Sequence, residues 1–281
     1  MTEKGDDMDH TPGKNLRYPI LLVHGMGFRD SKTINYWGRI PKALEQIGCK
    51  IFYGYQDSNA SIETNGQVIA NRINEIIEES GADKVNIIAH SKGGLDSRYA
   101  ISTLHAASKV ASLTTINTPH NGSKTVDMLM KFPQPLVKFA GFGTDCWFRV
   151  LGDQHPESYK VFHSLTTKGA KTFNMNNPDD ADVYYQSYAF AMRNPFSDIF
   201  MWLPGLIVGI VEGENDGLLT PEAVKWSNFR GVYHGVGNRG ISHCDEVDMR
   251  RRPFSRKTGD GVSDIVDFYK DVVYELCEKG F

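Results

Sequence analysis

The sequence has no hydrophobic run long enough to cross a membrane. The apolar stretch 201–211 falls short of the roughly 18 residues that a spanning helix needs, and it contains Pro204 and Gly205. The first 15 residues are polar and charged, without the apolar segment of a secretory signal. We therefore expect no transmembrane segment. The compartment stays open between cytoplasmic and exported without a cleaved N-terminal signal.

Cysteine and net charge are also low. The formal net charge is −3 at pH 7, which argues against nucleic-acid binding because no basic surface is there to replace phosphate counterions. The four cysteines lie too far apart for the C-x-x-C spacing of a metal site, so free thiols and one disulfide both remain open. We interpret the one dense basic cluster as a solvated loop, formed by Arg250, Arg251, Arg252, Arg256 and Lys257.

Internal repeats and low-complexity tracts are absent as well. At 281 residues the chain can bury a large core, and its length fits one α/β domain as well as two small ones. Residues 1–16 are predominantly polar and are predicted to form a tail, and residues 17–281 are predicted to form the domain. No feature of the sequence indicates the oligomeric state.

An apolar strand over 85–89 leads into a helix through a serine that is set between small residues. Ala89, Ser91 and Gly93 match the A-x-S-x-G form of a nucleophile elbow, a cramped turn that lifts a serine hydroxyl above the edge of a sheet. Free backbone N–H groups at the start of the helix then point at whatever the serine attacks. The strand before the motif and Gly94 after it make the motif more specific than five residues alone. We therefore predict that Ser91 is a nucleophile.

Strands and helices alternate along most of the chain. Amphipathic helical patterns lie between apolar strands, and a last helix with one apolar face closes the chain. This alternation predicts an α/β fold: a mostly parallel, doubly wound sheet with helices on both faces and a site at the carboxyl ends of its strands. The stretch 199–211 fits a helix or a strand. Strands are predicted at 18–23, 50–53, 85–89, 113–118 and 183–190.

A glycine-rich loop, His24-Gly25-Met26-Gly27, follows the first strand. An acyl-transfer enzyme needs two N–H donors where the oxyanion forms, and such a loop can bring one of them close to the nucleophile. We predict the backbone N–H groups of Met26 and Lys92 as the two donors. Taken alone, His24-Gly25 fits an ordinary strand-ending turn equally well.

Apolar residues crowd into the segment 125–171. Prolines and glycines interrupt them, so the segment suits short helices better than a sheet. We predict a helical lid or acyl-binding cap inserted at about 125–171. The alternative is a buried helical insertion with no part in binding.

A nucleophilic serine needs a histidine base and an acid that orients it, in the chain order serine, acid, histidine. His243 lies in a polar loop before the last helix and is preferred to His234, whose surroundings suggest a strand. Asp216, on an Asn-Asp-Gly turn, is the preferred acid. Its rivals are Asp198, Glu212 and Glu214.

These blocks together resemble the signatures of bacterial triacylglycerol lipases of the Pseudomonas and Proteus type. The similarity lies in the runs 18–25, 85–94, 215–218 and 243–247, with weaker likeness between them. It implies an α/β-hydrolase fold and hydrolysis of carboxylic esters with apolar acyl chains. It also implies Ser91, Asp216 and His243 as triad, Met26 and Lys92 as oxyanion donors, and a lipid or ester substrate met at a lipid–water interface.

The same machinery would serve a phospholipase, a thioesterase or an amidase, and a non-catalytic hydrolase-fold protein that binds a lipid or a partner is a further alternative. The chemistry itself requires no cofactor. The resemblance also implies a structural calcium ion near the histidine, for which Asp198 and Asp245 are the candidate ligands. Met249 stands where the family has an amide ligand, and a thioether does not bind a hard cation. The alternative is that both carboxylates are solvated or paired with arginines.

Overall fold

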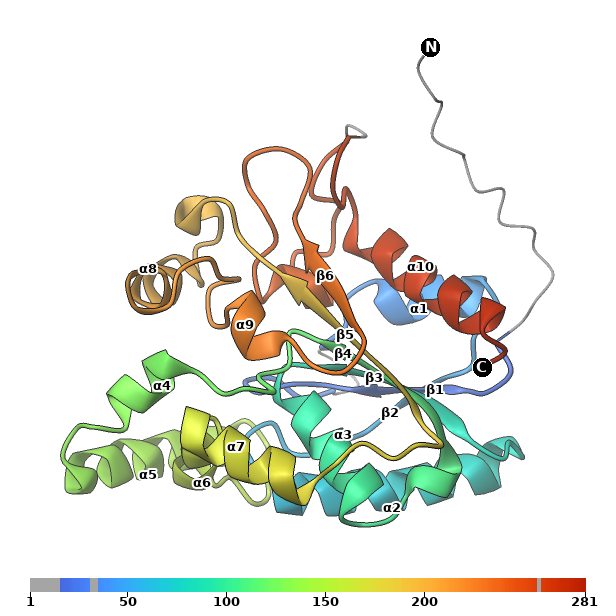
Figure 1. The fold of residues 1–281 in the computed structure, drawn as a ribbon, viewed down its shortest axis with the longest axis horizontal. Coiled ribbons are helices and arrows are strands. Elements are labelled where there is room, and N and C mark those ends of the chain that lie inside the picture. The colour runs from blue at the N-terminus through green and yellow to red at the C-terminus, as the bar shows by residue number, and fades with distance from the viewer. Residues whose placement is uncertain (1–15, 31–34, 257–258) are drawn as a thin grey trace.

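A parallel sheet of six strands forms the centre of the protein. The structure is a computed structural model that describes residues 16–30, 35–256 and 259–281. The strands lie in the order β2-β1-β3-β4-β5-β6, and each neighbouring pair is parallel. This confirms the predicted α/β fold (Figure 1). The strands are β1 (Ile20–Val23), β2 (Ile51–Tyr53), β3 (Val85–His90), β4 (Val110–Ile116), β5 (Tyr184–Phe190) and β6 (Phe229–Tyr233).

Helices cover both faces of the sheet, which explains why its central strands are apolar throughout. In β1, Ile20 and Leu22 pack into one core with α1 (Ile40–Gln46) and α10 (Ile265–Glu278). The alternate residues, Leu21 and Val23, pack into a second core with α2 (Ile62–Ser80) and α3 (Lys92–Ser102). Figure 1 shows α1 and α10 on one side of the sheet and α2 and α3 on the other.

The segment between β4 and β5 forms helices that extend from the sheet at one end of the molecule (Figure 1). The longest of them, α5, has only Gly141 fully buried, and it packs against α6. The helices are α4 (Lys124–Leu129), α5 (Gln134–Val150), α6 (Ser158–Ser164) and α7 (Thr167–Asn176). They cover the segment predicted as a lid, and whether it moves stays a prediction.

Several shorter elements follow β5. The stretch that fitted a helix or a strand contains a helix, α8 (Trp202–Val211), which packs against η2 (Pro195–Ser197) and α4. Among the described residues, no helix is both long and apolar enough to cross a membrane. The remaining short helices are η1 (Ala107–Lys109), η2 (Pro195–Ser197), α9 (Pro221–Val224) and η3 (Asp245–Val247).

None of the four cysteines forms a disulfide, so of the two states left open by the sequence the structure has the thiols. The predicted polar tail lies outside the described residues except for Leu16, and Lys257 of the basic cluster lies outside them too.

Candidate active site

Ser91 stands at the junction between β3 and α3. Its φ of 53° and ψ of −133° place it in a backbone conformation that non-glycine residues rarely adopt. A strand that turns directly into a helix holds this residue at the carboxyl edge of the sheet, as expected for a nucleophile elbow. The side chain is almost buried.

Small residues around Ser91 are required by close backbone contacts. A Cβ atom on Gly93 would lie 2.4 Å from the carbonyl oxygen of His24, and one on Gly25 would lie 2.7 Å from the Cβ atom of Ser91. A Cβ atom on Gly94 would lie 2.2 Å from the Oγ1 atom of Thr118. The glycines therefore let the loop after β1, the elbow and the end of β4 approach one another.

His243 and Asp216 complete a hydrogen-bonded series with Ser91. The Nε2 atom of His243 lies 3.0 Å from Ser91 Oγ, and its Nδ1 atom lies 2.5 Å from Asp216 Oδ2. The backbone N–H of His243 also donates to the carbonyl oxygen of Asp216 at 2.8 Å. The structure therefore brings together the three residues chosen from the sequence, in the geometry of a serine, a base and an orienting acid.

Asp216 is fully buried in a turn that satisfies its carboxylate. The backbone N–H groups of Leu218 and Leu219 donate to Oδ1 at 2.8 and 2.7 Å. Burial acts to raise the pKa of Asp216, but the charge and hydrogen bond of His243 and these two N–H groups outweigh it and hold the pKa below its ordinary value. The carboxylate is thus kept ionised beside the imidazole.

The rival residues have other partners. His234, which follows the end of β6, pairs with Glu214 at 2.8 Å. Glu212 accepts hydrogen bonds from the Ser123 hydroxyl and from the N–H and hydroxyl of Thr125. Neither carboxylate contacts His243 through a described hydrogen bond or ion pair.

The two predicted oxyanion donors belong to segments that adjoin Ser91. Met26 belongs to the loop after β1, which Gly25 holds against the elbow, and Lys92 is the first residue of α3. No described residue accepts a hydrogen bond from the backbone N–H of either. The Lys92 side chain turns away into the interior, where Nζ pairs with Asp96 at 2.7 Å.

Glu246 is a site residue that the sequence reasoning missed. Its carboxyl group is fully buried, 2.8 Å from His90 Nε2, 2.7 Å from Asn117 Nδ2 and 3.5 Å from His243 Nδ1. Burial, followed by the negative charge of Asp216, raises the pKa of Glu246 well above its ordinary value. The raised pKa favours the protonated, uncharged form of this carboxyl group. The sequence feature that could have identified Glu246 is its position three residues after His243, in the turn η3.

His90 connects this carboxyl group to the loop after β1. Its Nδ1 atom lies 2.7 Å from the Tyr36 hydroxyl, which accepts a hydrogen bond from the N–H of Gly25 at 3.1 Å. Burial, with the charges of His243 and His24, lowers the pKa of His90 well below its ordinary value. A neutral chain of buried groups thus links Glu246 to the oxyanion loop.

Two places in the described part of the chain raise the question of a metal. Ligand atoms of His90, His243 and Glu246 lie within 4.8 Å of one another, but these side chains are already hydrogen-bonded in the network above. Asp198 and Asp245, the candidate calcium ligands, are buried near each other and face Arg250, at 3.7 and 3.1 Å.

A family model for the alpha/beta hydrolase fold matches residues 18–194. The chain therefore belongs to the α/β-hydrolase family. It is 29% identical to triacylglycerol lipase 2 of Saccharomyces cerevisiae, over 88% of this chain and 75% of that enzyme. It is 33% identical to a triacylglycerol lipase of Pseudarthrobacter phenanthrenivorans, over 58% of this chain and about half, 54%, of that enzyme. The predicted resemblance to triacylglycerol lipases is confirmed.

Solved structures show the same fold. The lipase of Staphylococcus hyicus superposes with a TM-score of 0.67 at 18% identity, over 96% of this chain and 98% of that one. A metagenomic carboxyl esterase superposes with a TM-score of 0.70 at 18% identity, over 95% of this chain and 77% of that one.

Proposed function

We propose that this protein is a serine hydrolase that cleaves carboxylic esters of apolar acyl chains through an acyl-enzyme on Ser91. The observation that carries the proposal is the contact of Ser91 Oγ with His243 Nε2 at 3.0 Å, together with Asp216 on the far side of the imidazole. The similarity to triacylglycerol lipases supports an ester as substrate.

In the proposed reaction, Ser91 Oγ attacks the ester carbonyl while His243 Nε2 takes its proton. The ionised Asp216 holds the imidazole in the correct tautomer and stabilises the cation that forms. His243 then gives the proton to the leaving alcohol, and an ester bond to Ser91 replaces the substrate's ester bond. Water repeats the same steps on the acyl-enzyme and releases the carboxylic acid.

The negative oxygen of the tetrahedral intermediate rests on the N–H groups of Met26 and Lys92. Among the described residues, no backbone carbonyl oxygen accepts a hydrogen bond from either of these N–H groups. In comparable sites the loss of one such donor costs about 3–4 kcal/mol of transition-state stabilisation. The buried side chain of Lys92 pairs with Asp96, one turn further along the same helix.

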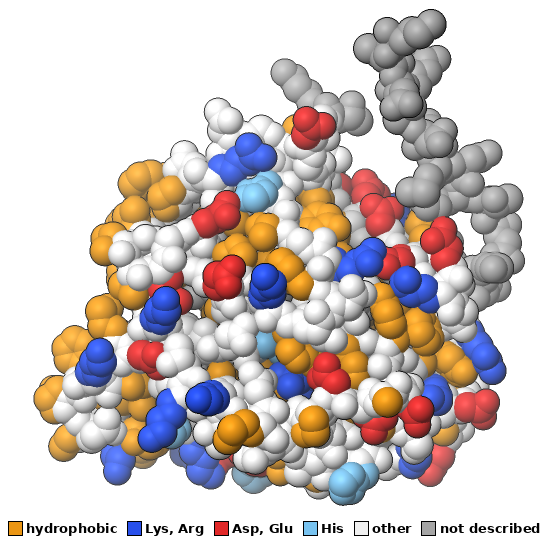
Figure 2. Space-filling view, viewed as in Figure 1, with side chains coloured by type: hydrophobic (Ala, Val, Ile, Leu, Met, Phe, Trp, Pro, Cys, Tyr) orange, Lys and Arg blue, Asp and Glu red, His pale blue; other side chains and the backbone are white. Residues whose placement is uncertain are grey.

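Exposed apolar side chains on α5 and around α8 support an apolar substrate. Figure 2 shows hydrophobic side chains gathered along the side of the molecule that carries α5 and α8. Exposed apolar surface on this scale is characteristic of contact with a lipid or a partner. On α5 the exposed residues are Leu136, Phe139, Phe142, Trp147 and Val150, and around α8 they are Phe196, Ile199, Phe200, Leu203 and Ile210.

We expect the moving part of the proposed lid to be α4 with α5. Glu212 holds the start of α4 through Ser123 and Thr125. Asp153, just after α5, accepts hydrogen bonds from the N–H groups of Ser58 and Asn59. Between these two anchors the helices make few buried contacts, so opening them costs little compared with opening the sheet.

A fluorophosphonate probe tests the nucleophile, and a series of p-nitrophenyl esters from acetyl to palmitoyl tests the acyl preference. We expect labelling and turnover by the native protein, loss of both in Ser91→Ala, and retention of both in Ser102→Ala at the other end of α3. Equal rates for the native protein and Ser91→Ala would exclude Ser91. Labelling with rates highest for acetyl esters would keep the triad and exclude the apolar acyl site.

A further inference from the structure

Two buried carboxylates lie against the loop that carries His243. Asp198 follows η2, and Asp245 comes two residues after the histidine. Ser242 joins them, because its hydroxyl donates to Asp198 Oδ2 at 2.7 Å and its backbone N–H donates to Asp245 Oδ2 at 3.0 Å. Both side chains are almost inaccessible to solvent, so two negative charges here need compensation.

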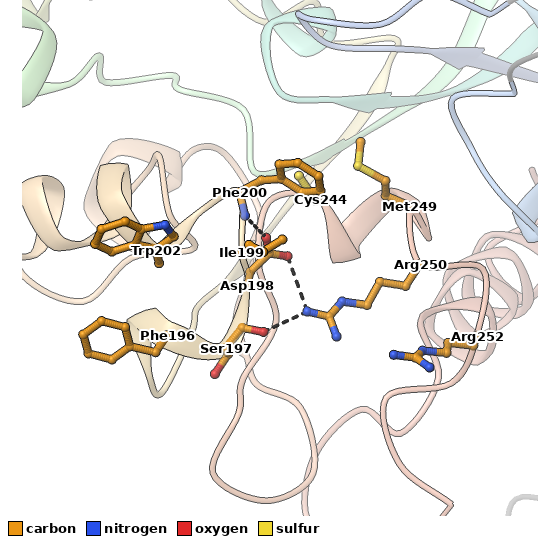
Figure 3. A pocket seen from close by; sticks show the side chains of 10 residues that line it. All are labelled: Phe196, Ser197, Asp198, Ile199, Phe200, Trp202, Cys244, Met249, Arg250 and Arg252. Atoms are coloured by element: carbon orange, nitrogen blue, oxygen red, sulfur yellow. Dashed lines mark hydrogen bonds and ion pairs between the residues drawn. The ribbon is translucent and has the colours of Figure 1, made fainter.

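Two arginines supply that compensation. The Nε atom of Arg250 lies 3.1 Å from Asp245 Oδ1, and its Nη2 atom lies 3.7 Å from Asp198 Oδ2. The same Nη2 donates to the carbonyl oxygen of Ser197 at 2.8 Å. Figure 3 shows Arg250 reaching toward Asp198 and Ser197. Arg239 Nη2 lies 2.5 Å from Asp245 Oδ2.

These residues do not fit a calcium ion. The Arg250 guanidinium already contacts both carboxylates that would have to ligate the cation. The two carboxylates and two guanidinium groups sum to zero charge, so an entering divalent cation would meet two positive groups without a negative excess. Met249 contributes a thioether where a hard cation requires an oxygen ligand.

We propose that Arg250, assisted by Arg239, takes the place of a divalent cation and makes the protein independent of calcium. Its guanidinium bridges the segment at Asp198 to the loop at Asp245, as an ion with two carboxylate ligands would. Arg250 is then a positioning residue: it acts on His243 through Ser242, whose N–H and hydroxyl both depend on the bridged carboxylates. Its effect on turnover rests on the proposed function.

The first test is thermal unfolding of the native protein and of Arg250→Ala, each in EDTA and in about 10 mM calcium chloride. We expect the native Tm to be the same in both. Removal of Arg250 leaves two buried carboxylates undercompensated, so its Tm in EDTA should fall by roughly 5–10 °C. Calcium should restore part of that loss, because the variant exposes two carboxylates to a cation.

Arg252→Ala is the matched control. Arg252 lines the same cavity of about 890 Å³ (Figure 3) but forms no ion pair with a described carboxylate. Its Tm should match that of the native protein and should not respond to calcium. Arg250→Lys keeps the charge without the planar fork and should recover part of the stability in EDTA.

Turnover of a soluble ester gives the second readout. We expect Arg250→Ala to lose roughly 10- to 100-fold in kcat in EDTA, with partial recovery in calcium and a smaller loss in Arg250→Lys. If Arg250→Ala does not fold, calorimetric titration of the native protein with calcium decides the matter. No binding heat is expected, and a stoichiometric heat would overturn the proposal.

A native Tm that falls in EDTA, or an Arg250→Ala Tm equal to the native value in EDTA, would overturn it as well. These readouts do not require any activity. A protein that hydrolyses no ester but keeps a calcium-independent Tm would therefore refute the proposed function and leave the arginine bridge supported.

Discussion

The Oε2 atom of Glu246 lies 2.8 Å from the Nε2 atom of His90, in the fully buried space behind the proposed triad. A carboxyl group whose pKa is raised thus stands next to Asp216, whose pKa is lowered. The two carboxyl groups share Asn117, whose Nδ2 donates to an oxygen of each, at 2.7 Å for Glu246 Oε1. Burial and the negative charge of Asp216 both disfavour a second negative charge on Glu246.

This arrangement predicts that the contribution of Glu246 to the stability of the folded protein depends on pH. Its pKa is raised in the folded state, so its contribution to stability is fully present below its ordinary value of 4.5 and is lost as the pH rises toward the folded value. Glu246→Gln does not titrate. The Tm of the native protein, measured relative to Glu246→Gln, should therefore fall as the pH is raised above about 4.5.

Differential scanning calorimetry across this range provides the measurement. Glu78→Gln, on the exposed face of α2, serves as a control for the loss of one carboxylate at the surface. A native-minus-Glu246→Gln difference that stays constant across the range would show that Glu246 is already ionised in the folded protein.

The same carboxyl group predicts the behaviour of an Asp216 variant. Asp216→Asn should lower kcat by roughly 10²- to 10⁴-fold, because the imidazole loses its ionised partner. Glu246 lies 3.5 Å from His243 Nδ1 and is left as the nearest acid. Residual activity should therefore rise with pH as Glu246 ionises, and Asp216→Asn/Glu246→Gln should lose this rise. If Asp216→Asn and the double variant have the same pH profile, Glu246 does not take over the role of Asp216.

The sequence predicted every strand of the sheet except β6, and it predicted the three residues that the structure brings together at the elbow. Central parallel strands such as β1 and β3 are apolar throughout, and the elbow at Ser91 depends on neighbours in the chain. Glu246 was missed because its role depends on His90 and Asn117, which are distant in sequence. The helix α8 was left undecided because its apolar residues continue around the helix without a polar face.

From the sequence, Asp198 and Asp245 could be assigned only to two alternatives. They are either calcium ligands or carboxylates that are solvated or paired with arginines. The sequence shows three consecutive arginines at 250–252 but does not show which of them turns inward. Arg250 contacts both carboxylates, whereas Arg251 and Arg252 are exposed. That difference depends on the left-handed turn at Asp248 and on the position of η2 across the cavity.

Gly94 predicts a steric requirement of the elbow. In Gly94→Ala the new methyl group would lie 2.2 Å from Thr118 Oγ1, so the hydrogen bond from Thr118 to the Ser91 carbonyl oxygen has to shift. We expect a loss of about 1–3 kcal/mol in the free energy of unfolding. Gly143→Ala is the matched control, since its methyl group meets nothing within 4 Å in the helix α5. It should gain about 0.5–1 kcal/mol. Denaturant titration measures both, and equal values would contradict the close packing at Thr118.

The exposed face of α5 predicts a distinction between dispersed and aggregated substrates. Replacement of Phe139, Phe142 and Trp147 by serine removes apolar area that would enter a lipid surface, and each such side chain contributes about 1.5–3 kcal/mol when buried. Activity on an emulsified triacylglycerol should fall at least roughly tenfold. Turnover of monomeric p-nitrophenyl acetate should stay within about twofold, because none of the three side chains contacts the triad.

Val68→Ser, an exposed apolar position on α2, controls for general loss of surface hydrophobicity and should leave both rates unchanged. Initial rates by pH-stat titration on the emulsion and by absorbance on the soluble ester, with all proteins at equal concentration, provide the comparison. A parallel fall in both rates would indicate that α5 supports the fold of the site. Unchanged rates on the emulsion would show that this face does not meet the lipid and that the substrate reaches Ser91 by another side.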